Sequence, residues 1–230
     1  MAYRILKSAS ARPVKGVLFD MDGVVLDTET LYTRFWMEAA NAYGYPMTFE
    51  QSLGLRSLNR DRGEKYLEKC FGEKVDYPKL RLERIKRMNA WIDEHGVDPK
   101  PGINELLSFL HKNNIPCAIT TSSPQERIKN HLTPLGLYDK FDAVCSGYEV
   151  KHGKPEPDIY LYGAKTLGLP PADCLALEDS PAGIESAFRA GTMAVVIPDK
   201  DQPSEKTLSE SFAKADCLTD ICELIEELNR

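Results

Sequence analysis

Acids, hydroxyls and one lysine follow four short apolar segments of this chain. Asp20-Met21-Asp22-Gly23, Thr121-Ser122-Ser123 and Glu178-Asp179-Ser180 come directly after three of the segments, and a stretch after the remaining one leads to Lys154. In an open parallel sheet, the carboxyl ends of the strands form the edge at which ligands bind, so we expect these groups to meet there. Acids that suit a divalent ion, together with hydroxyls and a lysine that suit phosphate, favour metal-assisted phosphoryl chemistry.

Each of these groups has a separate task in such chemistry. Carboxylate oxygens suit Mg²⁺, which also takes a phosphate oxygen. An aspartate can then attack phosphorus and form an acyl phosphate, and a second carboxylate two residues later can exchange protons with the leaving oxygen and with water. Hydroxyl and N–H groups at the start of a predicted helix favour an anion, and Lys154 adds a compact positive charge.

The segments that position these groups alternate between short apolar runs and helical patterns. We expect strands at 15–19, 115–120, 141–145, 174–177 and 193–197, and helices at 102–112, 124–135, 157–168, 181–190 and 218–229. This alternation predicts βαβ units. The fold class is therefore α/β, with a doubly wound parallel sheet that is covered on both faces.

One block of the chain interrupts that alternation. A helix is expected over 28–43, with Thr28 as its N-cap. The stretch 44–98 that follows is rich in Lys, Arg, Glu and Leu and contains no convincing strand. We therefore expect an α-helical insert after the first strand.

The predicted boundaries follow from this insert. The α-helical cap domain comprises residues 29–99, and the α/β catalytic core comprises residues 1–28 and 100–230, with residues 1–14 as a short lead-in. Hinges are expected near Thr28–Glu29 and Lys100–Gly102, where Pro99, Pro101 and Gly102 punctuate the chain.

Composition narrows the class of protein. The chain has 230 residues, of which 42% are hydrophobic and 28% charged, with a formal net charge of −6. This balance argues against nucleic-acid and anionic-membrane partners, and no apolar run approaches the length of a membrane span. Six scattered cysteines without a CxxC pair indicate reduced, mostly buried thiols. We expect a cytoplasmic protein that is a monomer by default.

Four segments, in order, resemble the motifs of the haloacid dehalogenase (HAD) superfamily. They are Val17–Thr28 (VLFDMDGVVLDT), Ile119–Ser123 (ITTSS), Gly153–Tyr160 (GKPEPDIY) and Leu177–Ile184 (LEDSPAGI). The resemblance implies a doubly wound core with a mobile cap. The position of the insert, between the first and second motifs, is similar to the subgroup that has an α-helical cap and includes β-phosphoglucomutase and many phosphatases.

The resemblance also implies roles for individual residues. Asp20 is expected as nucleophile and metal ligand, and Asp22 as general acid/base whose backbone carbonyl also binds Mg²⁺. Thr121 and Lys154 are expected to stabilise the phosphoryl group, with Ser122 and Gly23 in the phosphate site. Asp179 completes the metal site, and Glu178 is either a second ligand or an outer-shell partner of the ion.

One departure bears on the reaction. β-Phosphoglucomutase carries a histidine four residues after the threonine of the first motif, where this chain has Tyr32. This favours a hydrolase that acts on a small phosphorylated metabolite, such as a sugar phosphate or a nucleotide, over a sugar-phosphate mutase. A phosphonatase with a cap lysine (Lys65, Lys69, Lys74, Lys79 or Lys86) and a non-catalytic HAD-fold binding protein remain open. A haloacid dehalogenase is a poorer match.

Substrate selection is expected to come from the cap. The candidates for substrate contact are Thr28, Tyr32, Arg56 and Arg60, of which the two arginines suit a second anionic group. The remaining charged features have simpler interpretations. His95, His111, His131 and His152 show no metal-ligand spacing and are expected at the surface, and Arg81, Arg84, Lys86 and Arg87 are interpreted as a solvated helix face.

Overall fold

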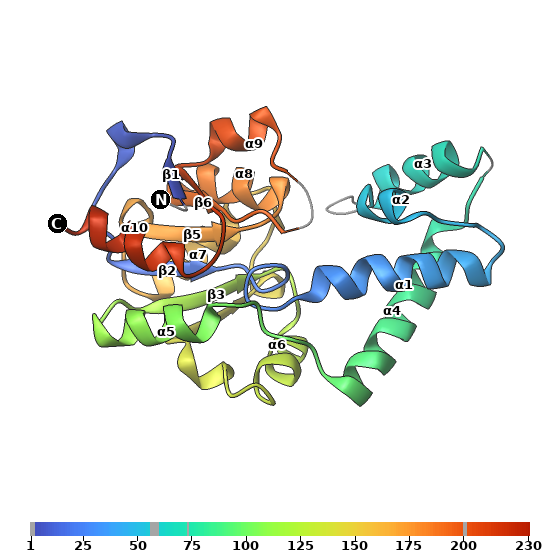
Figure 1. The fold of residues 1–230 in the computed structure, drawn as a ribbon, viewed down its shortest axis with the longest axis horizontal. Helices are drawn as coiled ribbons and strands as arrows, with labels where there is room; N and C mark the ends of the chain where they lie inside the picture. The colour runs from blue at the N-terminus through green and yellow to red at the C-terminus, as the bar shows by residue number, and fades with distance from the viewer. Residues whose placement is uncertain (1–2, 56–59, 73, 200–201) are drawn as a thin grey trace. The chain divides into compact units, whose positions relative to one another are not determined.

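The computed structural model describes residues 3–55, 60–72, 74–199 and 202–230, without the side chains of Arg60 and Asp61. Its contacts divide the chain into two compact units (Figure 1). The core unit comprises Met1–Leu26 and Pro99–Arg230, and the helical unit comprises Asp27–Asp98. These boundaries lie within two residues of those expected from the sequence.

The core unit contains a mostly parallel sheet. Among the described residues, seven strands lie in the order β1-β7-β6-β5-β2-β3-β4, and only the β1–β7 pair is antiparallel. The strands are β1 (Tyr3–Ile5), β2 (Gly16–Phe19), β3 (Cys117–Thr121), β4 (Ala143–Ser146), β5 (Cys174–Glu178), β6 (Met193–Val196) and β7 (Ala213–Ala215). The six parallel strands run outward from β2 in both directions, so the α/β, doubly wound fold class is confirmed.

Helices cover this sheet on both faces. Every residue of β2, β3, β5 and β6 is buried, as expected for parallel strands packed between two helical layers. The core helices are α5 (Ile103–Lys112), α6 (Gln125–Leu132), α7 (Asp158–Thr166), α8 (Pro181–Arg189), α9 (Glu205–Glu210) and α10 (Asp220–Leu228). Leu18, Ala118 and Ala176 point to one face, where they pack with residues of α7 and α8.

The expected interpretation of residues 1–14 as a lead-in was wrong. Tyr3–Ile5 form the edge strand β1, which pairs antiparallel with β7. Neither strand was expected, because each spans only three residues and Ala213-Lys214-Ala215 has little β propensity. Helix α9 was also not expected, although Ser204 caps it by accepting a hydrogen bond from the backbone N–H of Thr207.

The helical unit contains four helices among its described residues. They are α1 (Thr28–Ala42), α2 (Phe49–Leu53), α3 (Arg60–Phe71) and α4 (Tyr77–His95). Helix α1 packs against α4, which crosses it (Figure 1). Trp36, Leu67 and Leu80 belong to the cluster that joins α1, α3 and α4. Thr48 and Gln51 form a capping box at the start of α2.

Three local predictions were wrong. Asp27 occupies the N-cap position of α1 and its carboxylate accepts a hydrogen bond from the Thr30 hydroxyl, so Thr28 is the first helical residue. Arg84 is buried, with its guanidinium 4.4 Å from the ring centre of Tyr32. His131 is also buried, because α6 turns it toward the core beside Leu132. Helical periodicity alone did not show which face of each helix is covered.

Within the described parts of the chain, no helix combines the length and apolar character that a bilayer crossing requires. All six cysteines are unpaired. Burial raises the pKa of the Cys117 and Cys174 thiols to about 12, so these thiols stay protonated and are poor nucleophiles.

Candidate active site

The candidate site lies at the carboxyl ends of three neighbouring strands of the core unit. Strand β2 pairs in parallel with β3 and with β5, and Phe19 lies opposite Ile119 on one side and Leu177 on the other. The chain continues from Phe19 into Asp20, and from Leu177 into Glu178. The register therefore brings these two acids to the same edge of the sheet.

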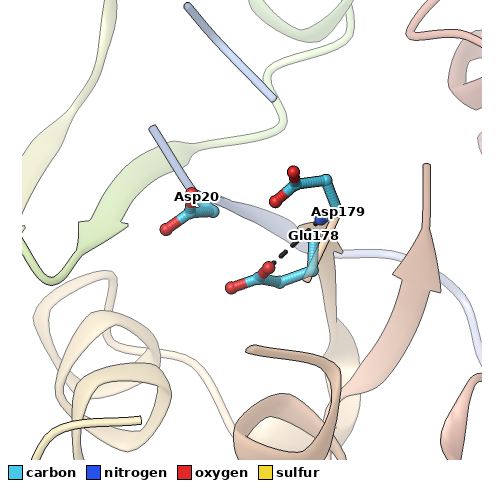
Figure 2. Close-up of side chains that lie close together, drawn as sticks. All are labelled: Asp20, Glu178 and Asp179. Carbon is cyan, nitrogen blue, oxygen red and sulfur yellow. Dashed lines mark hydrogen bonds between the residues drawn. The ribbon is translucent and has the colours of Figure 1, made fainter. Parts of the chain in front are cut away.

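Three carboxylates gather at this edge. Asp20, Glu178 and Asp179 each offer an oxygen, and these oxygens all lie within 4.8 Å of one another (Figure 2). Asp20 and Glu178 are buried, and Asp179 is half-buried. Acidic oxygens at this spacing form a site that fits a divalent cation.

Lys154 provides the positive charge inside this cluster. Its ammonium group lies 2.6 Å from Asp20 Oδ1 and 2.6 Å from Glu178 Oε1, and it also donates to the Thr120 carbonyl at 3.2 Å. Burial lowers the pKa of Lys154, but the two carboxylates raise it, and the net result lies well above the ordinary value. Lys154 is therefore a fixed cation and not a base.

Glu178 is fully buried, and protein donors occupy both of its oxygens. Oε1 accepts from Lys154 and from the Tyr160 hydroxyl at 2.8 Å. Oε2 accepts from the backbone N–H groups of Asp179 and Ser180 and from the Ser180 hydroxyl. A Cβ atom at Gly183 would overlap this carboxylate, so α8 approaches it closely. This bonding favours the outer-shell role over direct metal ligation.

The electrostatics of Asp20 fit a cation beside it. Burial raises the pKa of Asp20 to about 7, and Glu178 and Asp22 add to the rise, whereas Lys154 lowers it. A nucleophilic carboxylate must be ionised, and a divalent ion next to Asp20 favours that form. The protein donors reach Oδ1 of Asp20, and Asp179 faces the same space (Figure 2).

The turn after β2 explains the glycine in the first motif. Gly23 has φ +87°, a conformation that L side chains rarely adopt, and a Cβ there would overlap the Asp179 carboxylate. Its backbone N–H donates to the Leu26 carbonyl at 2.9 Å. Gly23 thus shapes the turn, and direct substrate contact through Gly23 stays a prediction.

The hydroxyl-rich loop after β3 lies at the same edge of the sheet. Thr121 is buried, and its hydroxyl oxygen accepts from the backbone N–H of Ser123, so its own proton can be given to an anion. Ser122 is exposed. A Cβ at Gly147 would press on the backbone of Thr121 and Ser122. The close approach of Gly147 therefore fixes the course of this loop.

Asp22 has different partners from Asp20. Its Oδ1 accepts from Arg127 Nη2 at 3.0 Å, and its Oδ2 accepts from the Ser123 hydroxyl at 3.2 Å. Its carboxylate is not one of the three that form the acidic cluster. The hydrogen-bond partners of Asp22 therefore differ from Lys154, the partner of Asp20.

The structure thus brings together the predicted residues Asp20, Lys154, Glu178 and Asp179. Thr28 and Tyr32 lie in the helical unit, where Tyr32 packs beside Phe35 and Met88. Arg56 and the side chain of Arg60 lie outside the described residues. The predicted roles of Thr28, Tyr32, Arg56 and Arg60 in substrate contact stay predictions.

The structure adds two polar residues that the sequence analysis did not name at the site, Arg127 and Tyr160. It also gives partners to Ser123 and Ser180, which the sequence analysis placed at strand ends without individual roles. Ser123, Tyr160 and Ser180 lie within the motif segments, so their positions were visible, but their partners were not. Arg127 resembles any exposed charge of a short helix, and only the fold shows that it reaches Asp22.

Known proteins share both sequence and fold with this chain. Residues 14–191 match the family described as haloacid dehalogenase-like hydrolase. The chain is 32% identical to the phosphorylated carbohydrates phosphatase of Thermotoga maritima, over 77% of this chain and 82% of the relative. It is 31% identical to the β-phosphoglucomutase of Bacillus subtilis, over 79% and 82%.

A solved structure shares the whole fold. The β-phosphoglucomutase of Clostridium difficile superimposes with a TM-score of 0.72 at 26% sequence identity, covering 94% of this chain and 97% of that one. The relatives thus include phosphatases and a mutase on one architecture.

Proposed function

The chain belongs to the haloacid dehalogenase-like hydrolase family, and on this basis we propose that it is a Mg²⁺-dependent phosphatase of small phosphorylated metabolites. A phospho-aspartate on Asp20 is the intermediate. The observation that carries the proposal is the buried arrangement of Asp20, Lys154 and Glu178, with Asp179 beside them. This arrangement supplies a nucleophile, a fixed cation and metal ligands at one edge of the sheet.

Asp20 and Asp179, with the backbone carbonyl of Asp22, would hold the ion. A divalent ion bound there neutralises charge on the phosphoryl group and so lets a carboxylate approach phosphorus. Glu178 acts from the outer shell, where it orients Lys154 and the start of α8. Lys154 and the Thr121 hydroxyl stabilise charge on the phosphoryl oxygens.

The reaction proceeds in two balanced steps. A carboxylate oxygen of Asp20 attacks phosphorus, the ester P–O bond breaks, and the Asp22 carboxyl gives its proton to the leaving oxygen, which departs as an alcohol. The Asp22 carboxylate then takes a proton from water while the water oxygen attacks the phosphorus of the phospho-aspartate. Inorganic phosphate leaves, and the Asp20 carboxylate and the Asp22 carboxyl are restored.

A sugar-phosphate mutase is the second candidate, because a β-phosphoglucomutase is among the relatives. In a mutase the phosphoryl group returns to the sugar and water is kept from it. Tyr32, at the position where the mutase pattern has histidine, favours hydrolysis. Phosphonatase and binding-protein functions have no supporting contact in the described residues. The cytoplasmic location and the monomeric state stay predictions.

A panel of about 100 phosphorylated metabolites, assayed for phosphate release with and without Mg²⁺, tests the proposal. We expect release that stops on chelation and returns with Mg²⁺. Acid quenching should trap a phosphoryl group on the wild type and none on Asp20→Asn. Rapid conversion of β-glucose 1-phosphate to glucose 6-phosphate without phosphate release would instead establish the mutase. An inactive wild type across the whole panel would favour a binding protein.

A further inference from the structure

The carboxylate of Asp22 accepts a hydrogen bond at each of its two oxygens. Arg127 Nη2 reaches Oδ1 at 3.0 Å, and the Ser123 hydroxyl reaches Oδ2 at 3.2 Å. One donor on each oxygen fixes both the position and the plane of the carboxylate. We call this arrangement the Asp22 clasp: Asp22, Ser123 and Arg127.

The two donors to Asp22, Arg127 and Ser123, both belong to well-packed parts of the core unit. Arg127 is the third residue of α6, a helix anchored by the fully buried Ile128 and Leu132. Ser123 is buried, and its backbone carbonyl accepts from the Ser146 hydroxyl at 2.7 Å. The donors are therefore positioned by the fold before any substrate binds, as an oriented catalytic group requires.

We infer that Arg127 is a positioning residue that, together with Ser123, orients the Asp22 carboxyl for proton transfer to and from the reacting oxygens. The inference rests on the proposed function, in which Asp22 is the general acid/base. Proton transfer needs hydrogen-bond geometry between Asp22 and the leaving oxygen. The planar guanidinium suits this task better than an ammonium group, because its N–H groups are fixed relative to one another.

The leaving group separates this role from a general structural one. An alkoxide leaves poorly without a proton, so formation of the phospho-aspartate from a sugar phosphate depends on Asp22. p-Nitrophenolate leaves as a stable anion and needs no proton. The ratio kcat/KM covers the steps up to phospho-aspartate formation, so it reports this difference between substrates.

The experiment compares wild type, Asp22→Asn, Arg127→Met and Arg127→Lys on two substrates, p-nitrophenyl phosphate and the fastest sugar phosphate of the panel. We expect Arg127→Met to lower kcat/KM for the sugar phosphate by about 10- to 100-fold, within the range of general acid–base contributions. For p-nitrophenyl phosphate we expect less than about a threefold loss. Arg127→Lys should restore part of the loss.

The controls separate the possible failures. Lys129→Met removes an exposed charge from the same helix and should leave both substrates unaffected. Thermal unfolding of each variant shows whether it folds, and Arg127→Lys keeps the test valid if Arg127→Met does not. An equal loss on both substrates, no loss, or a gain on the sugar phosphate would overturn the role of Arg127.

The proposed function has its own point of failure. If Asp22→Asn does not discriminate between the two substrates, Asp22 is not the general acid, and the basis for the role of Arg127 is lost as well. If Asp22→Asn discriminates and Arg127→Met does not, only the inference on Arg127 fails.

Discussion

The two aspartates of the first motif stand two residues apart, yet they lie in contrasting environments. Asp20 belongs to a buried network, in which the side chains of Lys154 and Glu178 are 9% and 1% exposed. Asp22 pairs with Arg127 in the clasp, where the two side chains are 21% and 25% exposed. Burial suits a nucleophile that must stay in place, whereas partial exposure suits a group that exchanges protons with substrate and water. The backbone turn between them separates the two tasks.

The largest expected effect comes from the buried side of this comparison. Asp20→Asn removes the nucleophile, and we expect kcat to fall by at least about a thousandfold on every substrate, whatever its leaving group. Phosphate release under steady-state conditions measures this loss. Asp139→Asn, at an exposed position of the core unit, is the matched control. Activity that survives in Asp20→Asn would mean that the buried network does not supply the nucleophile.

The second prediction concerns the cation of the buried network. Lys154→Met leaves Asp20 and Glu178 without their shared partner, so we expect kcat to fall by at least about a hundredfold. The free energy of unfolding should also fall, by about 3–5 kcal/mol at neutral pH, as for other broken buried ion pairs. Denaturant unfolding measures this change. Lys151→Met, which removes an exposed charge three residues earlier, is the control.

The pH dependence of that destabilisation sharpens the test. Without Lys154, the pKa of the Asp20 carboxyl in the folded state should lie further above its unfolded value, because burial already raises this pKa to about 7 and Lys154 no longer lowers it. The folded state then binds more protons, so the free energy of unfolding falls as the pH rises. We therefore expect the variant to approach wild-type stability as the pH is lowered from 7 toward 5. A difference in the free energy of unfolding between Lys154→Met and the wild type that stays the same from pH 7 to pH 5 would contradict this account.

The sequence predicts the strands and the acids of the candidate site, but it does not predict which side chains bind to those acids. The central strands were predictable because parallel strands buried on both faces appear as apolar runs. The acids were predictable because they end those runs, and Lys154 was predictable because it lies in the motif segment Gly153–Tyr160. The partners of Tyr160 and Arg127 were not predictable, since each bond joins a helix to a different element of the fold and depends on how that helix is rotated.

A smaller effect is expected from a substitution at Gly183, the residue of α8 that lies against the Glu178 carboxylate. In Gly183→Ala the new methyl group would overlap the Glu178 carboxylate. Relieving the overlap costs about 1–3 kcal/mol of stability. It also displaces the Glu178 carboxylate, which is a partner of Lys154. We expect kcat/KM to fall by about tenfold or more. Gly153→Ala is the control, because a Cβ at that position meets nothing within 4 Å. If Gly183→Ala and Gly153→Ala changed stability and kcat/KM equally, the close approach of α8 would not be what holds the Glu178 carboxylate in place.

The smallest effect should come from Tyr160→Phe, which removes one of the two donors to Glu178 Oε1. Lys154 continues to donate to that oxygen at 2.6 Å, so no charge is left unpaired, and we expect a stability loss of about 1 kcal/mol. The fall in kcat/KM should be less than about tenfold and equal for aryl and alkyl phosphates, because Tyr160 acts on the buried network and not on Asp22. Tyr43→Phe, at an exposed position, is the control. A leaving-group dependence in Tyr160→Phe would show that the two networks are coupled, and the separation of nucleophile and proton donor would then fail.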